Sequence, residues 1–206
     1  MPRTARLVVP NVPHHVTQRG NRREQVFFTD ADYEFYLDRL SFYCKKHQVE
    51  LWAYCLMPNH IHLILLPVSE DGLQKVLKPL HMVYRQYINK QKGWTGHLWQ
   101  GRFFSSAMDV SHAYSAIRYV ERNPVRANLT QTAENYKWSS AAYHCGLVAD
   151  SITDEIDDMY CLVEASNWSN WLLEEDALAN QIIAKNTSKG LPTGSAEFLS
   201  ALKTEK

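Results

Sequence analysis

His60 and His62 flank a single isoleucine, a spacing that puts both imidazoles on one face of a β-strand. Tyr119 and Asn123 are four residues apart, so on a helix they would share a face. Two imidazoles and an amide oxygen can bind a divalent metal and leave coordination positions open. A tyrosine hydroxyl beside such a metal can attack an electrophile that the metal polarises. This combination predicts covalent chemistry on a phosphodiester.

The elements that must position these residues follow from hydrophobic periodicity and turn residues. The predicted order is β-α-β-β-α-β followed by a third helix, which is the ferredoxin-like arrangement of an α+β protein. We expect an antiparallel sheet with helices on one face, then a C-terminal helix that carries Tyr119, and a tail. The strands are predicted at 12–18, 49–56, 60–66 and 102–109, and the helices at 31–47, 72–91 and 111–124.

The third predicted helix has an apolar stripe that does not include Tyr119. Ala113, Ile117 and Val120 belong to this stripe, whereas Tyr119 falls among polar neighbours. Tyr119 is therefore not expected to be an ordinary core residue. Asn123 precedes a proline, which disfavours helical ψ, so a helix that ends one residue early would turn Asn123 off the face of Tyr119.

The net charge of zero hides an uneven distribution along the chain. Residues 1–144 carry 18 Lys and Arg against 11 Asp and Glu, while residues 145–206 carry 4 against 11. We interpret residues 1–145 as a basic, nucleic-acid-binding catalytic domain and residues 146–206 as an acidic, partly helical extension. The extension can fold back over the basic surface and compete with DNA. Chance variation of surface charge is the alternative.

The remaining composition points to a reducing compartment. Cys44, Cys55, Cys145 and Cys161 are far apart and form no CxxC pair, so they fit small apolar residues better than a zinc site or disulfide framework. No signal peptide opens the chain, and the longest aliphatic run ends at Pro67, too short to span a membrane. We expect a cytoplasmic protein, associated with the nucleoid when it is bound to DNA.

Four segments together resemble one family. They are residues 14–21 (HHVTQRGN), 54–63 (YCLMPNHIHL), 96–103 (GHLWQGRF) and 118–127 (RYVERNPVRA). In this order they resemble the IS200-like Y1 transposases, and specifically the REP-associated tyrosine transposases. The resemblance covers residues 8 to 145, and residues 190–198 (GLPTGSAEF) are more loosely similar to a tail motif of that group.

The resemblance implies an HUH-type single-strand endonuclease. His60 and His62 match the metal-binding pair and Tyr119 matches the nucleophile, while Asn123 stands where insertion-sequence relatives usually carry a glutamine ligand. The implied cofactor is Mg²⁺ or Mn²⁺, which would polarise the scissile phosphate. Attack by Tyr119 would leave a 5′-phosphotyrosine and a free 3′-hydroxyl. The implied substrate is a single-stranded REP hairpin.

Basic and aromatic side chains supply candidate DNA contacts. Arg118 and Arg122 can also stabilise phenolate character on the nucleophile. Trp94 and Trp99 can stack on an unpaired base, with packing of the loop on the core as the alternative for Trp99. The DNA-binding candidates are Arg19, Arg22, Arg23, Lys78, Arg85, Trp99, Arg102, Arg118, Arg122 and Arg126, and each charge alone is more simply explained as solvated surface.

Three functions remain distinguishable. The first is metal-dependent, tyrosine-mediated cleavage and joining of REP hairpins; the second is a domesticated protein that binds such hairpins without turnover. A third, an unrelated HxH metallohydrolase, lacks further ligands apart from Asn123. Intact His60, His62 and Tyr119 favour the first. Analogy with the REP-associated group favours a monomer, although insertion-sequence relatives are dimers.

Overall fold

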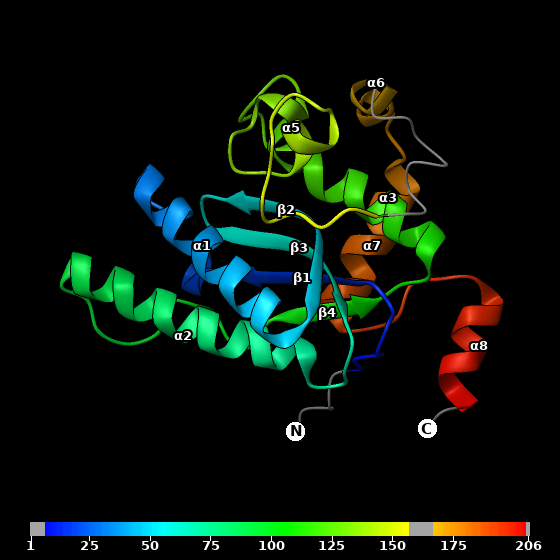
Figure 1. Cartoon of the computed structure of the whole chain (residues 1–206), viewed down its shortest axis with the longest axis horizontal. Helices are drawn as coiled ribbons and strands as arrows, with labels where there is room; N and C mark the ends of the chain where they lie inside the picture. Colours follow the sequence, from blue (N-terminus) through cyan, green and yellow to red (C-terminus); the bar gives the residue numbers. More distant parts are fainter. Residues whose placement is uncertain (1–6, 157–166, 205–206) are drawn as a thin grey trace.

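Four antiparallel strands form the centre of the computed structural model, which describes residues 7–156 and 167–204. They are β1 (His14–Arg19), β2 (Val49–Met57), β3 (His60–Pro67) and β4 (Phe104–Ala107), in the spatial order β2-β3-β1-β4. With α1 (Asp30–His47) and α2 (Gly72–Lys92) they make the predicted ferredoxin-like βαββαβ arrangement (Figure 1). The fold-class prediction is confirmed.

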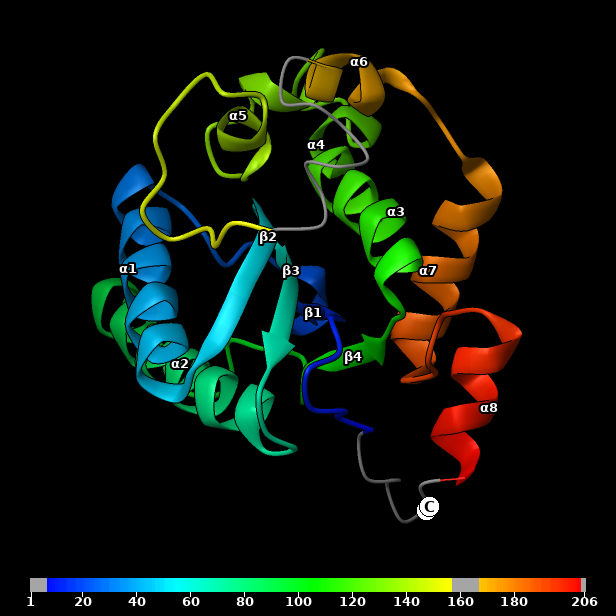
Figure 2. The ribbon, with the colours of Figure 1, turned by 45° about the vertical axis from the view of Figure 1, so that its right-hand side comes forward.

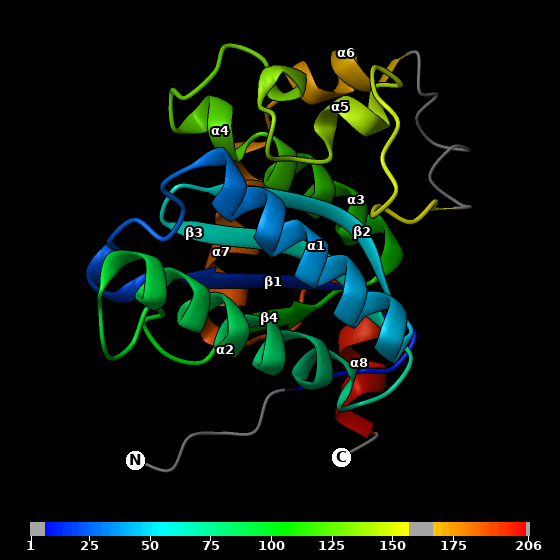
Figure 3. The same ribbon diagram turned by 60° about the vertical axis from the view of Figure 1, so that its left-hand side comes forward.

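The two faces of the sheet are covered by different helices. Ile61, Leu63 and Leu65 of β3 pack into the cluster that α1 and α2 cover, as the alternation predicted. The opposite face carries His62 and Ile64 and packs against α3 (Val110–Glu121) and α7 (Ala177–Lys189). Figures 2 and 3 show the two helical layers on either side of the sheet. The pair α1 and α2 thus occupies one face, as predicted, and α3, which carries Tyr119, lies on the other.

The turn before β3 is fixed by contacts with the end of β1. The amide of Gly20 donates to the carbonyl of Asn59 at 2.8 Å, and the amide of Val26 donates to that of Pro58. A Cβ at Gly20 would lie 2.2 Å from the carbonyl oxygen of Glu24, so a side chain has no room here. This close approach sets the position at which β3 begins, with His60 as its first residue.

The described part of the C-terminal extension packs on the β4 side of the sheet. The backbone amide of Thr193 donates to the carbonyl of Ala107 at 2.8 Å, and the hydroxyl of Ser106 donates to the carbonyl of Leu191 at 2.6 Å. Helix α7 contributes Ile183 to the same apolar cluster as α3. The extension therefore shares a core with the preceding domain, while the boundary at residue 145 stays a prediction.

The remaining helices are short, apart from α8. They are α4 (Asn123–Arg126), α5 (Ala141–His144), α6 (Trp168–Leu173) and α8 (Ala196–Thr204), with single 3₁₀ turns at Asn21–Arg23 and Ala133–Asn135. The helix predicted at 72–91 continues through Pro79. Cys44 and Cys55 are buried free thiols, as expected, and Cys161 lies outside the described residues. Within the part of the chain that the structure describes, no helix is long and apolar enough to cross a bilayer.

His14 makes the stability of this fold sensitive to acid. It is fully buried, with Nδ1 bonded to the carbonyl of Val12 at 2.7 Å and Nε2 accepting from the amide of Val9. Burial lowers the pKa of His14 from 6.5 to about 4, although the hydrogen bond to Val12 opposes the shift. The unfolded chain therefore takes up this proton near pH 6.5 and the folded protein only near pH 4.

We expect the free energy of unfolding to fall as the pH drops through this window, by about 3 kcal/mol for His14. Urea denaturation at about pH 7 and about pH 4.5 measures the change. In His14→Asn, which keeps a donor at the Nδ1 position, the loss on acidification should be smaller by roughly that amount. An equal loss in the variant and the wild type would contradict the assignment.

Candidate active site

His60 and His62 lie at the start of the central strand β3, where their rings approach each other. The ring centroids are 4.9 Å apart at an interplanar angle of 76°. The predicted pair therefore shares a face, as the strand alternation requires. His62 is almost fully buried and His60 is partly exposed, so a ligand can reach the pair from the side of His60.

Both imidazoles are neutral at pH 7. Burial lowers the pKa of His60 to about 4, with a smaller contribution from the charge of Arg19. Burial also holds the pKa of His62 well below its usual range, and His60, His15, Arg126 and Arg19 add to the shift. Neutral imidazoles keep a lone pair that can bind a metal ion. These rings are thus in the protonation state that a metal site needs.

The hydrogen bonds of the two rings direct coordination to one nitrogen of each. Nδ1 of His60 contacts the side-chain oxygen of Asn59, and Nδ1 of His62 lies 2.9 Å from Nε2 of His15. The Nε2 atoms of His60 and His62 remain for a ligand. The donor set fits a divalent transition metal, since imidazole nitrogen suits Mn²⁺ better than Mg²⁺.

Tyr119 projects from α3 onto this histidine pair. Its ring meets that of His62 edge-on, with centroids 5.7 Å apart at 81°, and that of His15 at 5.6 Å and 77°. Tyr119 is partly exposed, whereas Ile117 and Val120 of the same helix are fully buried. The prediction that Tyr119 lies off the apolar stripe is confirmed. Tertiary packing thus places the side chain of Tyr119 in contact with one of the two candidate metal ligands.

Arg126 lies over the ring of Tyr119. Its guanidinium carbon lies 4.0 Å from the centroid of Tyr119, and Nη2 donates to the Tyr119 carbonyl at 3.1 Å and to Oδ1 of Asn123 at 2.9 Å. Nη1 is buried and has no hydrogen-bond partner within the described part of the chain. A cation held here makes a cation–π contact with the ring of Tyr119 and can also bind an anionic ligand.

Asn123 does not share a helix with Tyr119, because α3 ends at Glu121 and α4 begins at Asn123. The prediction of one continuous helix as far as Pro124 is wrong, because the path breaks at Arg122 and Asn123 begins the next helix. Pro124 has no amide hydrogen to continue the hydrogen bonds of α3, but it is tolerated in the first turn of α4. Nδ2 of Asn123 donates to the carbonyl of Tyr119 at 3.0 Å and so caps the end of α3. Since Oδ1 accepts from Arg126, a ligand role for Asn123 stays a prediction that requires this bond to exchange.

Two arginines that were predicted to contact DNA are bonded to the acidic extension instead. Nη1 of Arg118 pairs with Glu174 at 2.8 Å, and Nη1 of Arg122 donates to the carbonyls of Leu172 and Glu174 at 2.8 and 2.6 Å. This segment folds back over the basic surface of α3, as the charge distribution suggested. Arg118 and Arg122 contact the chain itself in this state, so DNA would have to displace the segment to reach them.

The other predicted DNA contacts divide between two regions. Arg19, Arg22, Arg23 and Arg102 are exposed, and Arg19 is paired in register with His60. Arg22 and Arg23 have left-handed backbone conformations, with φ of 52° and 66°. Such a conformation costs a non-glycine residue roughly 1–2 kcal/mol, and residues that adopt it cluster at functional sites. Lys78 and Arg85 belong to α2, in the layer on the far side of the sheet from Tyr119 (Figure 3).

The stacking prediction for Trp99 is wrong. Trp99 is 7% exposed and packs against Tyr36, His81 and Tyr84, because the loop after α2 folds onto the core. Trp94 is half exposed and contacts Phe28 edge-on, so it remains accessible to a base.

The sequence reasoning assigned no role to His15, although it lies in one of the quoted motifs. His15 is 1% exposed and its ring is nearly parallel to that of His62, with centroids 5.1 Å apart at 6° and a hydrogen bond between the ring edges. The available signal was the pairing of β1 with β3, because His15 lies opposite Ile64 and hence on the face of His62. That register could not be fixed from local sequence.

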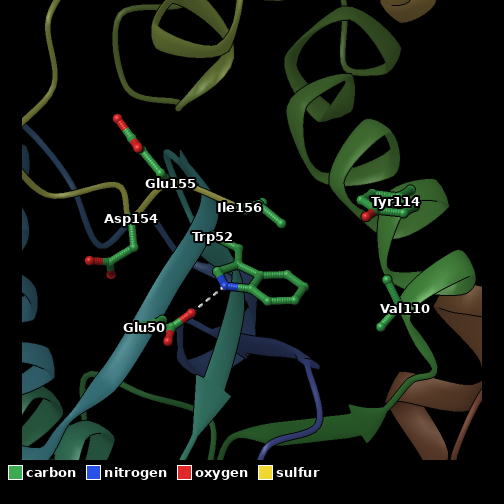
Figure 4. Close-up of a pocket in the computed structure, with 7 residues that line it drawn as sticks. All are labelled: Glu50, Trp52, Val110, Tyr114, Asp154, Glu155 and Ile156. Carbon is green, nitrogen blue, oxygen red and sulfur yellow. Dashed lines mark hydrogen bonds between the residues drawn. The ribbon is translucent and has the colours of Figure 1, made fainter. Parts of the chain in front are cut away.

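A cavity of about 380 Å³ lies elsewhere, between the start of β2 and the first turns of α3 (Figure 4). Glu50, Asp154 and Glu155 line it together with Trp52 and Tyr114, and Glu50 accepts a hydrogen bond from the indole of Trp52 at 2.8 Å. Three carboxylates repel phosphate, and Glu50 is at the end of β2 remote from Met57 and the histidine pair. This cavity is not part of the candidate active site.

The fold and site define a ferredoxin-like α+β protein in which a helix sets a tyrosine against a histidine pair on the central strand. The chain belongs to the IS200-like transposase family, which matches residues 8–123. A Haemophilus influenzae protein named as a REP-associated tyrosine transposase is 27% identical over 108 residues, which cover 47% of this chain and 61% of that relative. The match thus spans less than two thirds of the relative's length.

A solved structure supports the same fold. It is described as a REP-associated tyrosine transposase bound to a REP hairpin, and it matches with a TM-score of 0.57 at 18% identity. The match covers 76% of this chain and 99% of the other. The resemblance seen in the four sequence segments is therefore confirmed at the level of family and fold.

Proposed function

We propose that this protein is a metal-dependent, site-specific single-stranded DNA endonuclease and strand transferase with Tyr119 as its nucleophile. The observation that carries the proposal is the position of the Tyr119 ring, which contacts both the neutral His62 imidazole and the guanidinium of Arg126. Tyrosine is a poor nucleophile until its phenolate is stabilised. Arg126 supplies a positive charge in contact with the ring for this purpose.

The proposed substrate is a REP-type DNA hairpin with a single-stranded flank. A structural relative is described as bound to such a hairpin. In this chain the exposed arginines of the turn after β1 lie close to the start of β3 and can contact phosphates on either side of the cleavage point. We further propose that the protein acts in the cytoplasm, at the nucleoid, as a monomer.

The residues divide the reaction between them. Nε2 of His60 and of His62, with Oδ1 of Asn123 after it exchanges Arg126, would hold Mg²⁺ or Mn²⁺. When bound, such an ion withdraws charge from the scissile phosphate. Oη of Tyr119 attacks phosphorus and loses its proton to solvent, the P–O3′ bond breaks, and O3′ leaves as a hydroxyl after gaining a proton. Arg126 Nη1 donates to a phosphate oxygen as negative charge develops.

A non-catalytic, domesticated hairpin-binding protein is the second candidate function. The pairing of Arg118 and Arg122 with the extension does not separate the two functions, since it hinders hairpin binding and turnover alike. The neutral histidine pair and the placement of Tyr119 favour catalysis, because binding alone requires neither. Covalent product formation distinguishes the two functions.

Metal removal tests the proposal directly. Labelled single-stranded REP hairpins are incubated with the full chain and Mn²⁺ or Mg²⁺, and products are resolved on a denaturing gel. We expect a protein-linked 5′ product that falls by about 10³-fold or more in EDTA and returns on adding Mn²⁺. His60→Ala should lose the product at all practical Mn²⁺ concentrations. Tight hairpin binding without a covalent product under any metal would establish the binding function instead.

A further inference from the structure

A chain of hydrogen bonds links the candidate metal site to the C-terminal extension. Nδ1 of His62 lies 2.9 Å from Nε2 of His15, and Nδ1 of His15 lies 2.8 Å from Oγ1 of Thr187 in α7. All three side chains are buried, with exposed fractions of 6%, 1% and 1%. Solvent therefore does not compete for these bonds, and both ring nitrogens of His15 have a defined partner.

The chain of bonds has two possible proton arrangements. In one, Thr187 donates to His15, His15 donates from Nε2 to His62, and His62 must then carry its proton on Nε2. In the other, His62 donates from Nδ1 to His15, and His15 donates from Nδ1 to Thr187. Only the second leaves the Nε2 lone pair of His62 available to a metal ion.

We propose that His15 is a positioning residue for the metal site: it accepts the Nδ1–H of His62 and donates to Thr187, so that His62 presents Nε2 to the metal. This inference rests on the proposed function, because it presumes that His62 is a ligand. Partners of this kind fix the tautomer and ring orientation of a ligating histidine, and their loss typically lowers metal affinity by about 10–100-fold.

The proposal also gives the extension a part in the site. Thr187 lies outside residues 8–123, which carry the family match, and is 172 positions from His15. Helix α7 holds it in place through the apolar contact of Ile183 and the αL cap at Gly190. The hydroxyl of Thr187 is thus the point at which the extension contacts the histidine chain.

The test compares substitutions at His15 that differ in one hydrogen bond. His15→Asn keeps a donor near the Nδ1 position and loses the acceptor toward His62, whereas His15→Gln can place a carbonyl oxygen near the Nε2 position. We expect Mn²⁺ affinity, measured by calorimetry on the full chain without DNA, to fall by about 10–100-fold in His15→Asn. His15→Gln should recover most of the loss, and Thr187→Val should weaken binding in the same direction but less.

His14→Asn is the matched control, because His14 is an adjacent buried histidine that bonds only backbone groups of Val9 and Val12 among the contacts described. It should leave Mn²⁺ affinity unchanged. Thermal melting of every variant separates loss of folding from loss of affinity. Equal Mn²⁺ affinity in His15→Asn and the wild type would overturn the proposal.

A second readout does not depend on metal. Long-range ¹H–¹⁵N correlation spectra of the metal-free protein report which nitrogen of His62 carries the proton. We expect Nδ1–H in the wild type and in His15→Gln, and a mixture of tautomers in His15→Asn. A proton on Nε2 of His62 in the wild type would overturn the proposed arrangement, in which His62 donates from Nδ1 to His15. Wild-type Mn²⁺ affinity no greater than that of His62→Ala would instead overturn the proposed metal site.

Discussion

Replacing Tyr119 with phenylalanine is expected to abolish covalent attachment to DNA and leave hairpin binding intact. The substitution removes only the attacking oxygen and keeps the ring that contacts His62 and Arg126. Loss of a covalent nucleophile commonly lowers turnover by about 10³-fold or more, because no other group can form the intermediate. Denaturing gels measure the protein-linked product, and a mobility-shift titration measures hairpin affinity.

Tyr114 provides the control for this experiment. It lies on the same helix but lines the acidic cavity, away from the histidine pair (Figure 4). Tyr114→Phe should therefore retain cleavage within a few-fold of the wild type. A Tyr119→Phe protein that still forms a covalent product would place the nucleophile elsewhere and contradict the proposed mechanism.

Replacing Glu121 with alanine is expected to destabilise the fold by about 3–5 kcal/mol. Glu121 is fully buried at the C-terminal end of α3 and accepts hydrogen bonds from three donors. These are the hydroxyl of Ser140 at 2.6 Å, Nδ1 of His144 at 2.6 Å and the indole of Trp168 at 2.9 Å. Removing the carboxylate leaves all of them buried without that acceptor, which costs far more than a surface contact.

Chemical denaturation of the full chain measures this effect. Glu34→Ala is the control, since Glu34 is an exposed helical glutamate 3.9 Å from Lys137, and its loss should change stability by about 0.5 kcal/mol or less. The fluorescence of Trp168 also reports on this site, because its indole loses a hydrogen bond when Glu121 is removed. A destabilisation below about 1 kcal/mol would show that the three donors find other partners.

The hydrogen bonds of Glu121 connect the helix of Tyr119 to two later helices. They attach the end of α3, two residues beyond Tyr119, to α5 through His144 and to α6 through Trp168. Helix α6 leads into the segment whose Glu174 pairs with Arg118. One buried carboxylate therefore connects the helix of Tyr119 to the helix that precedes the acidic segment.

Local sequence determined the elements and much of the site. Alternation in β3 placed His60 and His62 on one face and Ile61, Leu63 and Leu65 on the other, since side-chain direction in a strand depends only on position. Helical periodicity likewise separated Tyr119 from the apolar stripe of α3. The proline after Asn123 indicated that the helix breaks nearby, although the break falls at Arg122 and Asn123 begins the next helix.

Only the tertiary structure decided which of these residues meet. The contact of His15 with His62 depends on the register between two strands. The contact of His15 with Thr187 depends on the docking of a helix that is distant in sequence. The burial of Trp99 and the return of Arg126 over Tyr119 depend on how a loop and a short helix fold back. Such contacts arise from the packing of different elements against one another, and the periodicity of a single segment carries no information about them.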